Sequence, residues 1–272
     1  MTKLITEVQD LTFLEWSKIR HSSGTAGSFL KATSTLGESK TYYKLSNYDY
    51  VNGVVGHESI NELIVDRLLN VLGIKHLHYD LINSKIKIND KIINTYVCSS
   101  QDFKEKNEEK VAFDIYYELE KKENETPLEF CVRNNFDDYI YEMLVVDFLI
   151  LNRDRHGANI EVLKNSKTKT IRLAPLFDHG LSLLALCRNN EAISKFDVME
   201  DRPIQSFVGS NSAYNNLKLI PATKFPQINK LKLSDKEIIM DGICDILGDE
   251  LSEKIWEMIW KRWCFYENLC NN

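Results

Sequence analysis

The 272-residue sequence lacks several features that would assign it to a common class of protein. It has no run of about 18 apolar residues, so no membrane-spanning helix is expected. Its N-terminal residues lack the apolar core of a secretory signal peptide. Its net charge of -6 argues against a general nucleic-acid binder and against a basic membrane-binding surface. No internal repeat is evident.

The six cysteines form no C-x-x-C pair; they are Cys98, Cys131, Cys187, Cys244, Cys264 and Cys270. This wide spacing favours buried, reduced thiols in a cytoplasmic protein over a disulfide framework. A hydrophobic content of 43% and a charged content of 27% are ordinary for a soluble globular protein. The length allows one large domain or two lobes with an ample core.

Polar residues gather in segment 152–159, directly after the mostly apolar run 143–151. Asp154 and Asn159 stand five residues apart in this segment. Two short apolar stretches follow and predict a hairpin, after which comes Asp178 in Asp-His-Gly. A phosphoryl-transfer site needs these parts in this order: a carboxylate that orients the hydroxyl, then an amide and a carboxylate that hold Mg²⁺. The alternative is a plain turn, because Asn, Asp and Gly are common turn residues.

Two features upstream fit the same chemistry. Residues 21–28 are mainly small or hydroxyl-bearing, so backbone N–H groups there can approach a phosphate closely. A flexible surface loop is the alternative. Residues 29–32 are predicted to form a strand that leaves this loop. Lys44 lies in a second short strand, 41–45, where it either faces solvent or pairs with nucleotide phosphates.

Residues 59–73 have the apolar spacing of a helix, with Gly73 as the terminator. Glu62 has two interpretations. It forms a capping box with Ser59, or it pairs with Lys44. The nearby His76-Leu77-His78 is interpreted as strand residues, because a single H-x-H without a Cys or a third ligand nearby seldom binds metal.

The remaining pattern predicts an α+β protein with two lobes. Residues 79–97 alternate as strands do, and the composition becomes more charged after residue 100. We therefore expect a strand-rich N-lobe at 1–100 and a mainly helical C-lobe at 101–272. Helices are expected from Thr126, which opens a capping box, and over residues 137–151, 234–247 and 251–265.

These motifs together resemble the HipA-like serine/threonine kinases, in a short form. The resemblance covers residues 22–180 and rests on the Ser/Gly loop, Lys44, the helix that begins at Asn61-Glu62, segment 152–159 and the segment that ends at Gly180. Only about 20 residues precede the loop, so the additional N-terminal subdomain of longer members is expected to be missing. No helix-turn-helix partner domain is expected within the chain.

The resemblance implies a two-lobed protein-kinase-like fold, with ATP and Mg²⁺ as cofactors. It implies that Lys44 holds the ATP phosphates, that Glu62 positions Lys44, and that Asp154 is the catalytic base or orienting residue. Asn159 and Asp178 would ligate Mg²⁺. Further nucleotide contacts would come from Ser23, Gly24, Thr25, Gly27, Ser28, Lys31, Cys98, Ser100 and His156.

The implied function is Mg²⁺-dependent transfer of phosphate from ATP to a serine or threonine of a protein substrate. Autophosphorylation of a loop serine near Ser23 and an antitoxin or other regulatory partner are further expectations. Two alternatives stay open. One is a lipid or small-molecule kinase, because Asp154-Arg155-His156 followed by Asn159 also resembles phosphoinositide kinases. The other is a pseudokinase that binds nucleotide, although the presence of Lys44, Asp154, Asn159 and Asp178 argues against it.

Overall fold

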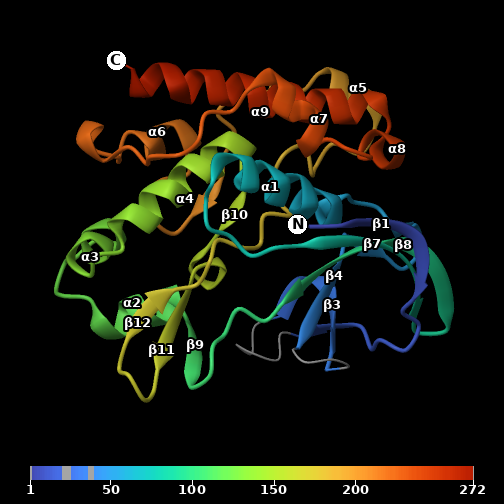
Figure 1. The fold of residues 1–272 in the computed structure, drawn as a ribbon, viewed down its shortest axis with the longest axis horizontal. Coiled ribbons are helices and arrows are strands. Elements are labelled where there is room, and N and C mark those ends of the chain that lie inside the picture. The colour runs from blue at the N-terminus through green and yellow to red at the C-terminus, as the bar shows by residue number, and fades with distance from the viewer. Residues whose placement is uncertain (1, 20–25, 36–39, 272) are drawn as a thin grey trace.

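The main sheet is built from the first 101 residues and has six strands in the order β1-β7-β8-β4-β3-β2 (Figure 1). The computed structural model describes residues 2–19, 26–35 and 40–271. β1 pairs with β7 in parallel, and the other neighbours are antiparallel. The strands are β1 Leu4–Asp10, β2 Ser17–Ile19, β3 Ala26–Ser34, β4 Thr41–Leu45, β7 Asp80–Ile88 and β8 Lys91–Gln101. A separate two-stranded ribbon joins β5 Tyr48–Asp49 and β6 Gly53–Val54.

Strand register places Lys44 near the middle of this sheet. On β4, Lys44 lies opposite Lys31 of β3 and opposite Cys98 of β8. Gly27 and Ser28 belong to β3, so this strand begins earlier than the predicted residue 29. Ser23, Gly24 and Thr25 lie outside the described residues.

Helix α1, Glu58–Leu72, packs against strands β4, β7 and β8 of the sheet. Its apolar residues Leu63, Ile64 and Leu68 are fully buried, as the helical spacing predicted. Gly73 ends the helix with φ 73°, a left-handed conformation that glycine adopts without strain. Of the two interpretations of Glu62, the capping box with Ser59 is wrong. The N-cap is His57, and the Ser59 hydroxyl donates instead to the Lys44 carbonyl at 3.0 Å.

The second half of the chain is mainly helical (Figure 1). Helix α4 is mostly buried from Ile140 to its end, and it packs against α6 and α9. The capping box at Thr126 is confirmed. The helices are α2 Phe113–Glu120, α3 Pro127–Arg133, α4 Asp137–Ile150, α5 Asn190–Ser194, α6 Ala213–Leu217, α7 Lys236–Ile239, α8 Cys244–Leu247 and α9 Asp249–Cys270, with 3₁₀ turns at Gly157–Asn159, Ala222–Lys224 and Leu233–Asp235.

The predicted continuous helix over 234–247 is wrong. The segment forms a 3₁₀ turn followed by the short helices α7 and α8. Gly242 lies between them with φ 67°, a left-handed conformation that a continuous α-helix cannot contain. The final helix α9 is confirmed and crosses the top of the molecule in Figure 1.

Three further strands form a small sheet in the order β12-β11-β9. Strands β11 and β12 are the predicted hairpin after segment 152–159 and pair in antiparallel fashion. Next to it, two residues of the segment itself form β10, which pairs with β13. These strands are β9 Glu108–Ala112, β10 Asp154–Arg155, β11 Glu161–Asn165, β12 Ile171–Leu173 and β13 Gln205–Ser206.

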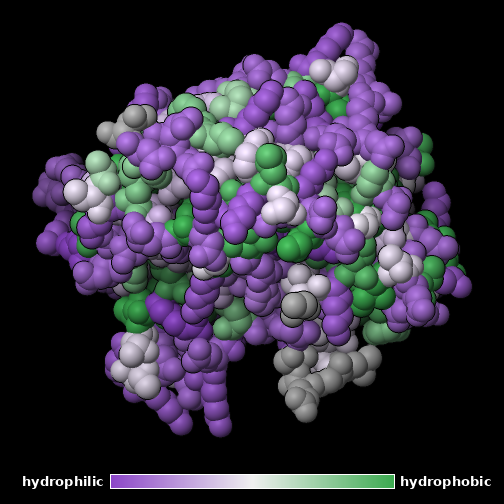
Figure 2. Space-filling view, turned by 45° about the horizontal axis from the view of Figure 1, so that its top comes forward, coloured by the Kyte–Doolittle hydropathy of each residue, from purple (hydrophilic) through white to green (hydrophobic). Residues whose placement is uncertain are grey.

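The surface in Figure 2 is mainly hydrophilic, with hydrophobic residues in small, separate groups. Among the described residues, no helix combines the length and apolar character needed to cross a bilayer. All six cysteines are free thiols. Cys98, Cys131 and Cys187 are buried as expected, whereas Cys244 and Cys270 are exposed and Cys264 is half-buried.

Candidate active site

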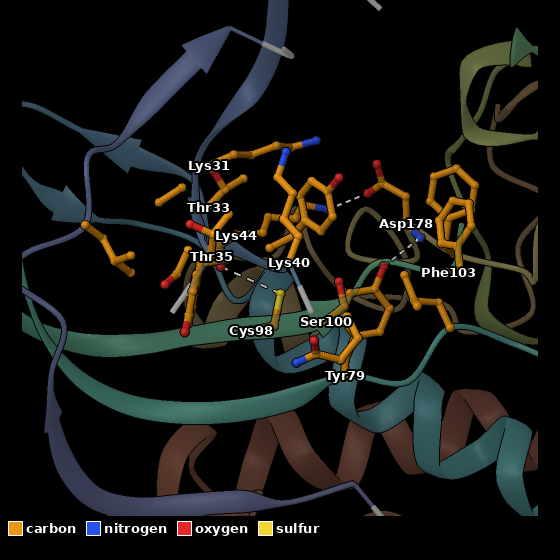
Figure 3. A pocket seen from close by; sticks show the side chains of 18 of the residues that line it. Lys31, Thr33, Thr35, Lys40, Lys44, Tyr79, Cys98, Ser100, Phe103 and Asp178 are labelled. Atoms are coloured by element: carbon orange, nitrogen blue, oxygen red, sulfur yellow. Dashed lines mark hydrogen bonds and ion pairs between the residues drawn. The ribbon is translucent and has the colours of Figure 1, made fainter. Parts of the chain in front are cut away.

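A cavity of about 550 Å³ lies between the main sheet and the segment around Asp178 (Figure 3). This volume is within the usual range for sites that bind small molecules. Its lining combines aromatic side chains with four lysines, namely Phe13, Tyr42, Tyr43, Tyr79, Phe103 and Phe177 with Lys31, Lys40, Lys44 and Lys110. Glu15, Glu161 and Asp178 contribute carboxylates. Such a lining suits a ligand that has both a flat, apolar part and an anionic part.

Lys44 is held between two carboxylates at one side of this cavity. Its Nζ lies 3.0 Å from Oε1 of Glu62. It also contacts Oδ1 of Asp178, as Figure 3 shows. Burial lowers the pKa of Lys44, but the charges of Asp178 and Glu62 outweigh burial and hold the pKa above its ordinary value. Lys44 is therefore a permanent cation, and the helix carboxylate and the strand lysine meet as the kinase interpretation requires.

Glu62 also binds the backbone that follows Asp178. Its carboxylate accepts hydrogen bonds from the N–H groups of His179 at 2.9 Å and Gly180 at 3.0 Å. Burial raises the pKa of Glu62, while Lys44 and the two N–H groups provide three donors for its ionised form. One side chain of α1 thus positions both the lysine and the metal-ligand candidate.

A close approach between α1 and this backbone makes that arrangement possible. A Cβ on Gly180 would lie 3.1 Å from Glu58 Cβ and 3.2 Å from Glu62 Oε1, so glycine permits the contact. Asn61 Nδ2 donates to the carbonyls of Gly180 and Ser182, each at 3.0 Å. Asp178 itself has φ 59°, and the Tyr79 hydroxyl accepts from its N–H at 3.3 Å.

Segment 152–159 is folded by hydrogen bonds within itself. Helix α4 ends at Leu151 in a left-handed conformation, with φ 50°. Asn152 Oδ1 accepts from the Asp154 N–H at 3.2 Å, and Asn159 Nδ2 donates to the Asp154 carbonyl at 2.7 Å. The two predicted functional residues Asp154 and Asn159 are therefore directly linked.

Arg155 connects this segment to the one that carries Asp178. Its guanidinium is fully buried and forms a bidentate pair with Asp147 of α4, with distances of 3.0 and 2.9 Å. It also donates to the carbonyls of Asn159 at 3.1 Å and Phe177 at 2.8 Å. One arginine thus holds the backbone of Asn159, one metal-ligand candidate, and of Phe177, which directly precedes the other, Asp178.

The histidines of the two motifs have different environments. His156 is partly exposed, with Nε2 3.8 Å from Asp154 Oδ1, and its Nδ1 accepts from the Ala158 N–H at 3.2 Å. Burial lowers the pKa of His179 well below its ordinary value, so this ring is neutral. His156 can contribute to chemistry near Asp154, whereas the buried His179 packs under the Asp178 backbone.

No family model and no curated protein matches the chain. Among solved structures, it is similar to a crystal structure of the Helicobacter pylori proinflammatory kinase CtkA. The TM-score is 0.62 with 19% sequence identity, over 94% of this chain and 93% of that one. The chain has a kinase-like fold. The predicted two-lobed, kinase-like α+β fold is thus confirmed, and the relationship to this group of kinases is supported at the level of the fold.

A second similar structure is the Shewanella oneidensis MR-1 toxin–antitoxin complex of HipA, HipB and operator DNA. The TM-score is 0.43 with 14% identity, over 91% of this chain and 58% of that one. This TM-score is too low for a shared fold to be inferred from it.

Within this fold, several of the described candidate residues lie together at the cavity. Lys31, Lys44, Cys98, Ser100 and Asp178 all line the cavity. Cys98 and Ser100 lie within strand β8, which continues to Gln101 before the chain leaves the sheet. Asp154, His156 and Asn159 are not among the described lining residues, but Arg155 links their segment to Phe177, which does line the cavity.

The sequence interpretation missed three positioning residues, Asn61, Tyr79 and Arg155. A signal existed for Arg155, because Asp147 is the one charged residue inside an otherwise apolar run. A buried carboxylate requires a partner, and the nearest arginines in sequence are in segment 152–159. Nothing in the sequence pattern pointed to Tyr79.

Gly157 tests how closely segment 152–159 packs against Asp114 of α2. A Cβ at this position would lie 2.5 Å from Asp114 Cβ and 3.0 Å from the Asp114 backbone nitrogen. We expect Gly157→Ala to lower the free energy of unfolding by about 1–3 kcal/mol through overpacking, measured by urea denaturation. In an Asp114→Gly background the loss should be smaller. An equal loss in both backgrounds would contradict the steric explanation.

Proposed function

We propose that the protein is a kinase that uses ATP and Mg²⁺ to phosphorylate a serine or threonine of a protein. The observation that carries this proposal is the arrangement of Lys44 between Glu62 and Asp178 at the wall of a cavity lined by lysines and aromatic residues. The order of these residues along the chain is the one expected of a phosphoryl-transfer site, and the kinase-like fold supports the proposal.

The donor set fits the proposed cofactors. Asp178 offers carboxylate oxygens, and Asn159 offers an amide oxygen, which are the ligand types that Mg²⁺ prefers. When bound, Mg²⁺ would neutralise charge on the phosphates. Lys44 is a buried permanent cation that faces the cavity, as a group that binds phosphate should be. Leu77, Phe103 and Phe177 provide apolar surface for a base.

Asp154 is proposed to accept the proton of the substrate hydroxyl and to orient it for attack. Its backbone is held by Asn152 and Asn159. Glu62, Asn61 and Arg155 are positioning residues, since they hold Lys44, the Asp178 segment and the Asn159 segment in their mutual arrangement.

A protein acceptor is favoured over a lipid because the surface after Gly180 is not basic. Of its cations Arg188, Lys195 and Arg202, two are neutralised by neighbouring carboxylates. Lys195 pairs with Glu191 at 2.6 Å, and Arg202 pairs with Glu200 at 2.5 Å. Binding to anionic lipid headgroups relies on clusters of unneutralised lysine and arginine.

The proposal is tested by incubation of the protein with radiolabelled ATP and Mg²⁺. The acceptors are soluble lysate proteins in one arm and phosphatidylinositol-containing vesicles in another. We expect label on protein serine or threonine, identified by phosphosite mapping. That mapping also covers residues 22–28 of the kinase itself, where autophosphorylation is proposed. Label on lipid alone, or nucleotide binding with no transfer, would support the lipid kinase or the pseudokinase instead.

A regulatory protein partner is proposed from the sequence resemblance. The Shewanella oneidensis HipA structure contains HipB and operator DNA, which is a property of that assembly. For this chain, co-purification with the product of a neighbouring reading frame is the corresponding test.

The metal role of Asp178 gives a further prediction. Asp178→Asn should weaken Mg²⁺-dependent ATP binding by at least about tenfold, because a metal ligand loses its charge. Asp154→Asn is the matched control, because it makes the same chemical change at a residue proposed to act on the acceptor. Calorimetric titration with and without Mg²⁺ measures both. Equal affinities of the two variants would contradict the division of roles.

A further inference from the structure

An aspartate in the middle of α1 meets two histidines from the segment that follows this helix. Asp66 Oδ1 lies 3.1 Å from His76 Nε2 and 3.1 Å from His78 Nδ1. The three potential ligand atoms all lie within 4.8 Å of one another. Asp66 and His76 are buried, whereas the His78 side chain is 66% exposed. The sequence did not suggest this cluster, because Asp66 is ten residues away from the H-x-H pair.

The contacts of His76 suit a bound cation. Its Nδ1 lies 2.7 Å from the Ile74 carbonyl oxygen, and its Nε2 faces the Asp66 carboxylate. Both neighbours are acceptors, but a neutral imidazole has only one N–H. If Nδ1 donates to Ile74, the lone pair of Nε2 points at the carboxylate. A metal ion bound by Nε2 and Oδ1 resolves this conflict and fits the usual pattern, in which a ligating histidine donates its other N–H to a carbonyl.

Asp66 is oriented as a ligand of this kind would be. Asn70 Nδ2 donates to its Oδ2 at 2.8 Å, and the Tyr79 N–H donates to Oδ1 at 3.2 Å. With both imidazoles, Oδ1 therefore has three close nitrogen partners. If a metal ion lies between Oδ1 and the two imidazoles, the Tyr79 N–H still donates to Oδ1 and orients this ligand.

We propose that Asp66, His76 and His78 form a binding site for a divalent metal ion of the zinc class. Two imidazoles favour Zn²⁺ over Mg²⁺ or Ca²⁺, which prefer oxygen ligands. Zinc bonds to these atoms are about 2.1 Å long, so two ligands of a tetrahedral ion lie about 3.4 Å apart. The observed 3.1 Å separations from Asp66 need a small expansion, and the two imidazole nitrogens, which lie within 4.8 Å of each other, can reach this spacing by rotation of the exposed His78 side chain. Water supplies the fourth ligand on the open side, next to the exposed His78.

Residues of this proposed metal site adjoin the proposed nucleotide cavity, but metal binding does not require that the cavity bind nucleotide. Leu77 lies between the two histidines and lines the cavity, and its N–H donates to the Leu176 carbonyl at 2.8 Å. Tyr79 contacts both sites: its backbone N–H donates to Asp66 Oδ1, and its hydroxyl accepts from the Asp178 N–H. Bound metal would hold residues 76–79 in place and thereby stabilise this wall of the cavity.

The test is a titration of metal-free, full-length protein with Zn²⁺ in competition with a chromophoric chelator. Bound metal is also counted by elemental mass spectrometry. We expect one Zn²⁺ per chain and a rise in melting temperature on binding. His78→Ala should lower the affinity by at least about tenfold. Since His78 is exposed, this variant should keep its fold, which circular dichroism checks. Co²⁺ in place of Zn²⁺ should give a visible spectrum that changes in His78→Ala.

His156→Ala is the matched control, because it removes another partly exposed imidazole that stands next to a carboxylate. The proposal requires that this variant bind Zn²⁺ as the wild type does. Loss of binding in His156→Ala rather than in His78→Ala would place the ion at the candidate kinase site and overturn the proposal. Absence of stoichiometric binding in the wild type would also overturn it and would leave an imidazolium–carboxylate pair as the explanation. Either result is independent of whether the protein phosphorylates a substrate.

Discussion

Asp154→Asn is expected to reduce phosphoryl transfer by about 10²- to 10⁴-fold, the contribution of a positioned general base. The fold should be retained, because the hydrogen bonds to Asn152 and Asn159 are made by the backbone of residue 154. The amide cannot take up the proton of the substrate hydroxyl at neutral pH. The rate of transfer from labelled ATP at saturating nucleotide measures the effect.

The matched control for this loss is Asp138→Asn, the same change at an exposed residue in the first turn of α4. It should leave the rate within a factor of about two, as surface substitutions away from a site have small effects. A wild-type rate in Asp154→Asn would show that Asp154 is not the base. In that case His156, with Nε2 3.8 Å from Asp154 Oδ1, becomes the next residue to replace.

Arg155→Leu is expected to destabilise the protein by about 3–5 kcal/mol, because it leaves the buried carboxylate of Asp147 without its cation. It also removes the donors to the Asn159 and Phe177 carbonyls. The remaining folded protein should therefore bind Mg-ATP weakly even under stabilising conditions. Urea denaturation followed by calorimetry separates the two effects.

Arg133→Leu is a suitable comparison, because Arg133 also forms a bidentate carboxylate pair, with Glu125 at 2.6 and 2.7 Å. That pair lies at the surface, where screening by solvent makes ion pairs weak, so its loss should have a much smaller effect. The double variant Arg155→Leu, Asp147→Leu should recover part of the stability, since it removes the buried charge, but not the nucleotide affinity. Equal losses of stability in Arg155→Leu and Arg133→Leu would show that burial of Arg155 against Asp147 does not stabilise the fold.

Much of the candidate site could be predicted because its signals are local in sequence. The apolar spacing of residues 59–73 determines helix α1, and Gly73 ends it. The apolar run before segment 152–159 became α4, and the two stretches after it became the β11–β12 hairpin. Within these elements, Lys44, Glu62 and Asp178 were selected by residue type and order, and the structure brings them into contact.

Other features were predicted wrongly or not at all, because competing local rules apply to the same residues. Ser59 and Glu62 also match a capping box, but the N-cap of α1 is His57, two residues before Ser59, and Glu62 contacts Lys44 on the sheet. The apolar and capping pattern of 234–247 suggested one helix, whereas Gly242 adopts a left-handed conformation that divides it. The proposed metal site was rejected at the level of the sequence, because the H-x-H pair has no third ligand nearby in sequence and Asp66 comes from helix α1.

The sequence by itself determined the α+β class, the main helices and the candidate residues for the proposed phosphoryl transfer, because periodicity and short motifs are properties of residues close together in the chain. Only the tertiary structure decided which of two partners Glu62 takes, that Arg155 is buried against Asp147, and that Asp66 meets His76 and His78. These contacts join residues on different elements, so they depend on how α1 packs on the sheet and on how α4 packs beneath segment 152–159. Burial then requires that each of these charges find its partner there.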